Sequence, residues 1–185
     1  MRVLVAGVGY RNLRDYSVGV VVADRLGRYP WSGDVVVEDL SYNPIAVVQR
    51  LQDEPRETAF ERAIVVGAVA RAGRPPGTVT AYRWDGALPE SEDVQQAVAE
   101  AVTGVIALDN TLIVGRQFGG WPDDVIVVEV EPAVHDFGET FSDVIDRACE
   151  RVCALVARLA TDATAVAALP RAALGRAVGA SGLAG

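Results

Sequence analysis

Lysine is absent from this chain of 185 residues, and histidine is nearly so, with a single residue at position 135. Without lysine, the phosphate-binding GK[ST] motif of P-loop proteins cannot be formed. All 17 basic residues are arginines and stand against 25 acidic ones, so the formal net charge is −8. A surface of that sign repels phosphate backbones and anionic lipids, so we expect no nucleic acid partner and no membrane partner.

Long apolar runs and cysteines are also scarce. No stretch has the roughly 18 to 20 apolar residues of a membrane span, and the first residues lack the pattern of a secretory signal. We therefore expect a cytoplasmic protein. Cys149 and Cys153, the only cysteines, are four residues apart in a segment that reads as helical, which puts both on one face. A metal or redox site would need a CxxC pair or further ligands, so packing as small apolar side chains is the stronger interpretation.

The hydrophobic residues, half of the chain, gather in short runs that alternate with helical patterns. Strands are predicted at 2–6, 34–38, 63–68, 78–84 and 125–130. Helices are predicted at 17–28, 43–52, 91–103 and 140–160. Continuous β-branched runs are typical of strands covered on both faces, so this order predicts a three-layer α/β fold with a mixed, mainly parallel sheet of about five strands.

Two features bound this domain. The segment RPPGT at 74–78 is too short for a crossover helix, so the strands on either side of it are expected to form an antiparallel pair. The domain is expected to occupy residues 1–160. The remaining residues, 161–185, are rich in alanine and glycine, are interrupted by Pro170, and are expected to be a partly disordered tail with at most one short helix.

The loop after the first strand suggests a binding site. It carries four residues at fixed places: Gly7, Gly9, Asp15 and Gly19. Loops that follow parallel strands meet at one edge of the sheet, so this loop should lie beside Asp39 and Gly67, which end the second and third strands. A dinucleotide fingerprint is a poor match, because Asn12 stands at the third glycine and the loop is several residues too long.

The same loop resembles the N-terminal signature of the hydrogenase maturation endopeptidases, in which glycines and an asparagine precede a pair of acidic residues and a further glycine. The glycines and Asp15 match, whereas Tyr10 replaces the asparagine and Tyr16 replaces the second acidic residue. Later segments resemble that family in the same order: VVVEDL, IVVGAV, RPPGTVTAYRW, and GGWPDDVIVVEVEP through DFGETFSDVIDRA. The resemblance covers residues 1–160 and implies the fold of that family.

The resemblance also implies an activity and the residues that it needs. Members of that family clip a C-terminal peptide from the precursor of a nickel–iron hydrogenase large subunit, and nickel already in the substrate is thought to be read by two carboxylates and a histidine. At the matching positions this chain has Tyr16 and Gly67, and no histidine lies between Pro89 and Arg116. A phenol with a pKa of about 10 is a poor ligand at neutral pH, and glycine offers only backbone. We expect no resident metal or cofactor.

Three hypotheses remain open at this point. The preferred one is a non-catalytic assembly or binding factor for a hydrogenase-type large subunit or a related protein partner. The second is a divergent endopeptidase that uses Asp15 and Asp39, with help from Glu90, Glu92 and Asp93; the simpler alternative is that the aspartates anchor loop amides or cap helices and the other acids form a solvated first helical turn. The third is a small-ligand-binding module built on the first loop.

Aromatic residues and the one histidine complete the candidates. His135 beside Asp136 suggests a base with its orienting acid, but no nucleophile accompanies them, so a structural or exposed histidine is the stronger interpretation. Tyr10, Tyr16 and Trp31 suggest an aromatic contact surface, because aromatic side chains are enriched at protein interfaces. The alternative is that Tyr10 and Tyr16 simply pack over the mouth of the site.

Overall fold

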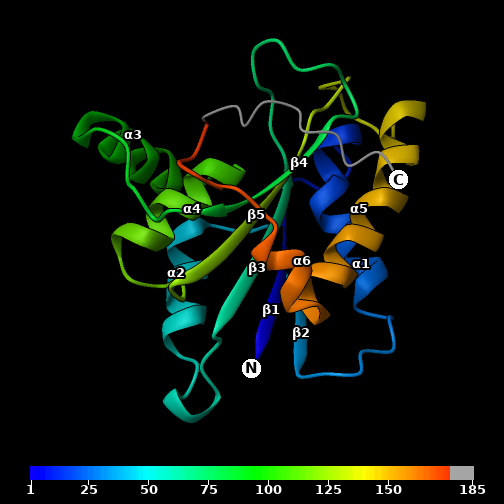
Figure 1. Ribbon diagram of the computed structural model, residues 1–185. Helices are drawn as coiled ribbons and strands as arrows, with labels where there is room; N and C mark the ends of the chain where they lie inside the picture. Colours follow the sequence, from blue (N-terminus) through cyan, green and yellow to red (C-terminus); the bar gives the residue numbers. More distant parts are fainter. Residues whose placement is uncertain (176–185) are drawn as a thin grey trace.

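The computed structural model describes residues 1–175 as a six-stranded sheet with helices on both faces (Figure 1). The strands are β1 (Val3–Val8), β2 (Val35–Asp39), β3 (Arg62–Ala68), β4 (Val79–Trp84), β5 (Asp124–Val130) and β6 (Arg171–Ala172). The helices are α1 (Val18–Leu26), α2 (Pro44–Gln52), α3 (Ser91–Val102), α4 (Leu108–Gln117), α5 (Asp143–Thr161) and α6 (Ala163–Ala167). Two 3-10 turns, η1 (Arg14–Ser17) and η2 (Arg56–Thr58), precede α1 and β3. The predicted mixed, three-layer α/β fold is confirmed.

The sheet has the order β2-β1-β3-β5-β4-β6, and its first four strands are parallel. β4 runs antiparallel, as expected, but the prediction that it pairs with β3 is wrong, because β5 lies between them. The loop that connects β3 to β4 crosses the end of β5 and is hydrogen-bonded to it. Val69 N–H donates to the Val130 carbonyl at 3.1 Å, and Gly77 N–H donates to the Glu131 carbonyl at 2.8 Å. Those bonds hold the loop at the end of β5.

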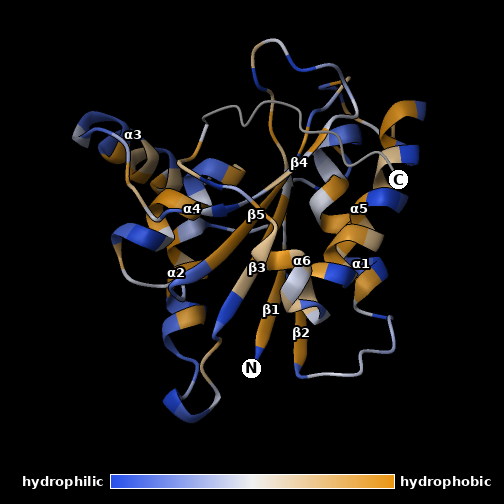
Figure 2. Cartoon of the chain, viewed as in Figure 1, coloured by the Kyte–Doolittle hydropathy of each residue, from blue (hydrophilic) through white to orange (hydrophobic). Residues whose placement is uncertain are grey.

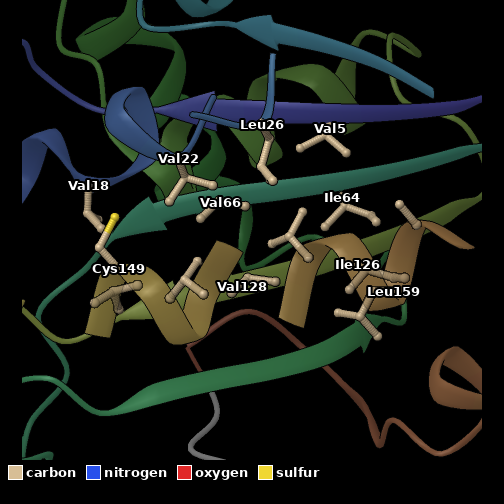
Figure 3. Packing of buried hydrophobic residues seen from close by; sticks show 14 of the residues in the cluster. Val5, Val18, Val22, Leu26, Ile64, Val66, Ile126, Val128, Cys149 and Leu159 are labelled. Carbon is tan, nitrogen blue, oxygen red and sulfur yellow. The ribbon is translucent and has the colours of Figure 1, made fainter. Parts of the chain in front are cut away.

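Alternate residues along the buried strands feed two apolar cores. On one face the strands pack against α1, α5 and α6, and on the other against α2 and α4, with α3 beside them (Figures 1 and 2). Figure 3 shows the first core, where strand side chains meet α1 and α5; among them are Val5, Ile64, Ile126, Val22 and Leu159. Full burial of such side chains stabilises the fold by about 1.5–3 kcal/mol each.

Helix α1 lies unusually close to the sheet. A Cβ atom at Gly7 would lie 2.1 Å from the Gly19 carbonyl oxygen, and one at Gly19 would lie 2.3 Å from the Val8 oxygen and 2.5 Å from the Val66 oxygen. Only hydrogen fits at those separations. The two glycines therefore let the start of α1 rest directly on β1 and β3, and this contact fixes the loop between β1 and α1.

Two elements, α4 and β6, were not predicted from the sequence. α4 begins with Asp109, Asn110 and Thr111 after its first residue and contains Gly115, all poor helix formers, but its apolar side packs into the core. In the segment assigned to a tail, α6 is the one short helix that was allowed for there, and β6 pairs with β4. The rest of that segment, 176–185, lies outside the described residues. No helix in the described part is both long and apolar enough to cross a membrane.

Candidate functional site

The expected meeting of loops at one edge of the sheet is confirmed. In the parallel register Gly7 is level with Asp39, and Val8 is level with Gly67, so β1, β2 and β3 end together. We call this the carboxyl edge. The loops after β1, β3 and β5 and the segment that leads into α4 surround it, so residues far apart in sequence share one site.

A cleft of about 310 Å³ opens at the carboxyl edge, between the ends of β1 and β3 and the start of α4. Its lining is largely apolar and includes Val8, Leu13, Tyr16, Val69, Val105 and Ile106. Its polar side chains are those of Tyr10, Tyr16, Asp109 and His135. Ile106 N–H donates to the Tyr10 hydroxyl at 2.6 Å, which joins the two walls. A more open groove continues from Tyr10 and His135 to Phe137, which is 87% exposed.

The wall that follows β1 is held in an unusual backbone conformation. Asn12 and Arg14 both have positive φ angles, 61° and 39°, which residues other than glycine adopt at a cost of about 1–3 kcal/mol each. Gly138 holds them there: its N–H donates to the Asn12 carbonyl at 2.9 Å, and its carbonyl accepts from Arg14 N–H at 3.0 Å. The loops after β1 and β5 therefore form one fixed unit.

Tyr16 stands at the position where the resemblance implies a metal-reading carboxylate. Its ring packs on the exposed His135 with centroids 4.6 Å apart and an interplanar angle of 49°. Burial, with smaller contributions from the charges of Glu131 and Asp15, raises the pKa of Tyr16 above its ordinary value. The phenol is thus neutral at physiological pH. Asp136 accepts the Phe137 N–H at 2.8 Å, so its carboxylate serves its own loop.

Gly67 stands at the second position where the resemblance implies a carboxylate, and its neighbours leave no space for a side chain there. A Cβ atom there would lie 2.9 Å from the Val8 oxygen and 3.3 Å from Leu108 Cβ and Cδ1. The first residue of α4 therefore covers the space that a longer side chain would need. Within residues 1–175, no group of three or more His, Cys, Asp and Glu side chains is arranged to hold a metal ion. The donors present do not fit the nickel contact that the resemblance implies.

Asp15 is fully buried and accepts four hydrogen bonds. Oδ2 accepts from the N–H groups of Ala133 at 2.9 Å and Val134 at 2.8 Å, and from the hydroxyl of Ser142 at 2.9 Å; Oδ1 accepts from Ser142 N–H at 2.8 Å. These bonds tie η1 to the loop after β5 and to the start of α5. The geometry is that of an anchor for loop amides, the simpler of the two roles considered for this residue.

Asp39 serves different partners on the surface. It accepts from Arg11 Nη2 at 2.8 Å and from Ser41 N–H at 3.0 Å, and Arg11 also pairs with Asp24. Hydrogen bonds to Asp24 and Asp39 raise the pKa of Arg11. The partners of Asp39 thus differ from those of Asp15, and no shared proton is needed to explain either carboxylate.

The remaining candidates lie away from the cleft. Glu90 precedes α3, and Glu92 and Asp93 are exposed in its first turn, as the simpler interpretation has it. Trp31 lies at the opposite edge of the sheet, between α1 and β2, where its indole donates to the Leu26 carbonyl at 3.0 Å. It therefore does not share a surface with Tyr10, and that part of the aromatic-surface hypothesis is wrong.

A buried ion cluster beside the cleft was missed by sequence reasoning. Arg71, in the loop after β3, donates both Nη atoms to Asp109 at 2.7 Å and also donates to Glu129 at 2.7 Å. Its backbone N–H donates to Glu131 at 2.9 Å. Because Asp109 lines the cleft and lies in the first turn of α4, Arg71 fixes one cleft wall against β5.

Glu129 is the centre of this cluster and is almost completely buried. It accepts from the Tyr82 hydroxyl at 2.9 Å and also pairs with Arg74. Burial by itself raises the pKa of Glu129, but the hydrogen bonds from Arg71 and Arg74 outweigh it and hold the pKa below its ordinary value. The sequence contains one sign of this cluster, a glutamate inside the apolar run VIVVEV, because a buried carboxylate requires charged or hydrogen-bonding partners.

No known sequence family matches the chain, and no curated protein matches it in sequence. Solved structures do resemble it. The hydrogenase 2 maturation peptidase of a Thaumarchaeota archaeon aligns with a TM-score of 0.59 and 23% identity over 86% of this chain and 97% of its own. HybD, the hydrogenase maturating endopeptidase of Escherichia coli, gives 0.57 and 23% over 88% and 94%. The endopeptidase HycI of Escherichia coli gives 0.60 and 19% over 96% and 100%.

The chain has the fold of the hydrogenase maturation peptidases. At these identities the likeness concerns the arrangement of the backbone. On this hydrogenase-maturation-peptidase fold, the positions that the resemblance assigns to the two metal-reading carboxylates carry Tyr16, packed on His135, and Gly67, covered by Leu108.

Proposed function

We propose that this chain is a non-catalytic binding factor that holds a segment of a protein partner in the cleft at the carboxyl edge. The partner we propose is a large subunit of the nickel–iron hydrogenase type or a related protein. One observation carries the proposal: the two positions expected to hold metal-reading carboxylates are a neutral phenol and a glycine with no space for a side chain. The structures of similar fold are described as hydrogenase maturation peptidases, which supports the choice of partner.

The cleft suits a polypeptide segment with small apolar side chains. Its lining buries apolar area, which contributes about 25 cal/mol per Å² removed from water. Val105 in the cleft and Phe137 in the adjoining groove extend the apolar lining to the surface, where a partner can reach it. The walls are fixed by the contacts of Asp15, Gly138 and Arg71, so little ordering of this chain opposes binding.

The test is co-expression with a candidate large subunit, followed by affinity capture and intact-mass measurement of that subunit. We expect capture without any change in the subunit's mass. Val105→Asp, which puts a charge in the cleft, should weaken capture by at least about tenfold, because a charge cannot be buried there unpaired. Phe118→Asp, a similar change of a half-exposed residue at the end of α4, is the matched control and should capture normally.

Two outcomes would contradict the proposal. Specific C-terminal shortening of the subunit that requires this chain would establish the endopeptidase alternative. Equal capture by the wild type and Val105→Asp would show that the cleft takes no part in the interaction.

The volume of the cleft also falls at the lower end of the roughly 300–1,000 Å³ of small-molecule sites, so saturable binding of a small apolar compound would favour the third hypothesis, a small-ligand-binding module. A cytoplasmic location stays a prediction.

A further inference from the structure

Three arginines from distant parts of the chain meet at the amino edge of the sheet, the edge opposite the cleft. Arg62 begins β3 and is level with Val3, close to the end marked N in Figure 1. Arg83 lies near the end of β4, which is antiparallel to β5 and therefore ends at this edge, and Arg171 begins β6. We call Arg62, Arg83 and Arg171 the arginine cluster. It forms no basic run in the sequence, because only the fold brings its members together.

A single carboxylate, that of Asp124, pairs with two members of the cluster. Its Oδ2 accepts from Arg62 Nε at 2.7 Å, and its Oδ1 accepts from Arg83 Nη2 at 3.0 Å and from Arg83 Nε at 3.2 Å. Asp124 alternates along β5 with Ile126, which belongs to the core beneath α1, α5 and α6. The two arginines therefore point to that face of the sheet.

The third arginine lies next to the second. In the parallel pair of β4 and β6, Arg171 is level with Arg83. Side chains that are level on neighbouring strands point to the same face, and like charges in that arrangement destabilise a sheet. Arg171 is exposed and forms no salt bridge with any of residues 1–175. Asp85, which follows β4, accepts Ala87 N–H and so serves its own loop.

The cluster has more positive charge and more donors than its partner uses. Three guanidinium groups face one carboxylate, so two positive charges have no counter-charge. Each guanidinium has five N–H donors, and the hydrogen bonds that these groups make within the described part of the chain all go to Asp124. Nη1 of Arg62, whose side chain is 10% exposed, is buried and donates to none of the described residues. A buried charged donor without an acceptor is costly.

The cluster also has a rigid base and an open side. Arg62 is held in the sheet by Asp124, whereas the side chain of Arg83 is 34% exposed and Arg171 is exposed. A ligand that approaches from solvent therefore reaches two guanidinium groups whose neighbour is already fixed. This local charge is opposite in sign to the net charge of −8 of the whole chain.

We propose that the arginine cluster binds a phosphate group, either as inorganic phosphate or as part of a small phosphate ester. A phosphate dianion supplies the two negative charges that the cluster lacks, and its oxygens suit the forked donors of arginine. A carboxylate would supply only one charge. The site lies at the opposite edge of the sheet from the cleft, so the inference holds or fails independently of the proposed protein partner.

The test is calorimetric titration of the full chain with sodium phosphate at mildly alkaline pH, where the dianion predominates. We expect saturable binding of phosphate and none of acetate. Arg171→Gln and Arg83→Gln should each weaken binding by at least about tenfold, because each removes charge-assisted hydrogen bonds. Arg147→Gln is the matched control, because it removes the same charge from an exposed residue of α5 and should bind like the wild type.

Unfolding midpoints separate binding from a structural role of Arg171. In chloride, Arg171→Gln should be at least as stable as the wild type, because it removes a like charge beside Arg83. Phosphate at about a hundredfold excess over its Kd should raise the midpoint of the wild type by about 5 °C. The midpoint of Arg171→Gln should rise much less, whereas that of Arg147→Gln should rise as in the wild type.

Glycerol phosphate distinguishes the two sources of the phosphate group. Tighter binding of glycerol phosphate than of inorganic phosphate would indicate an ester, and weaker binding would indicate the free anion. The inference would be overturned if neither compound bound saturably or if Arg171→Gln and Arg83→Gln bound as tightly as the wild type. An equal loss of affinity in Arg147→Gln would also overturn it, since the effect would then come from the charge of the whole chain.

Discussion

Asp15 accepts hydrogen bonds from both the backbone N–H and the hydroxyl of Ser142, at 2.8 and 2.9 Å, across 127 positions of sequence. Ser142 is the N-cap of α5, but its own side chain does not cap that helix. The hydroxyl points to Asp15 instead, and the carboxylate takes up the N–H groups that would otherwise be unpaired. Asp15, which the sequence suggested as a catalytic acid, thus connects the loop after β1 to the start of α5.

The Asp15 anchor predicts a large loss of stability on substitution. We expect Asp15→Ala to lower the free energy of unfolding by about 3 kcal/mol, since it leaves several N–H groups buried without acceptors. Urea denaturation followed by circular dichroism measures this. Asp39→Ala, at a surface ion pair, should cost less than about 1 kcal/mol. A similar cost for both would mean that the Asp15 bonds contribute little.

Glu129→Gln should destabilise the fold by about 1.5–3 kcal/mol, because it removes the negative charge to which both Arg71 and Arg74 donate, although Arg71 keeps its pair with Asp109. Glu129 has a pKa below its ordinary value of 4.5, so its carboxylate contributes stability that is present above about pH 4.5 and is lost as the pH falls through the lowered pKa. The wild type should therefore lose stability on acidification more steeply than Glu129→Gln. Unfolding midpoints between pH 7 and 3 test this, and parallel pH curves would contradict it.

Restoring carboxylates should not restore a nickel contact. Tyr16→Asp supplies one donor beside His135, and we expect titration calorimetry to detect no nickel binding above that of the wild type. Gly67→Asp should destabilise the fold by about 1–3 kcal/mol through overpacking against Leu108. Adding Leu108→Ala should not restore stability, because it removes a buried core side chain and leaves both the Leu108 Cβ position and the Val8 oxygen close to the new Cβ atom. Tight nickel binding by Tyr16→Asp would show that the remaining donors are sufficient.

The two thiols should react unequally. Cys149 is buried, and its interaction with Cys153, together with burial, raises its pKa; the same interaction lowers the pKa of the half-buried Cys153. Because the thiolate is the nucleophile, iodoacetamide should modify Cys153 first. Mass spectrometry after timed quenching measures this, and Cys153→Ser should leave a chain that alkylates far more slowly. Faster reaction of Cys149 would contradict the assignment.

The fold was largely predictable because its strands are continuous β-branched runs and its first helices carry clear start signals, such as Pro44 at the beginning of α2. α4 was missed because Gly115 and the polar first turn disfavour a helix locally. The glycine is needed for packing against another part of the chain, since a Cβ atom at Gly115 would lie 2.1 Å from Trp121 Nε1. β6 has two residues and no periodicity to detect.

The site was harder to predict than the fold. The sequence placed Gly67 and Asp39 correctly at one edge, because parallel strands determine where their ends lie. It did not reveal that Leu108 closes Gly67 or that Arg71 joins Asp109 to Glu129, since both contacts depend on where α4 packs. Pairings between distant segments of this kind leave no local pattern in the chain.

The near contact of Gly7 with Gly19 has a consequence for tracing ancestry and activity in such chains. The two glycines allow α1 to lie close to the sheet, because only a hydrogen atom fits between the two backbones. This packing requirement is the same whatever reaction the neighbouring site performs. A chain can thus shed every reactive group and still keep the spacing of its glycines, for mechanical reasons alone. The spacing of these glycines therefore reports on the fold and says nothing about the chemistry of the site.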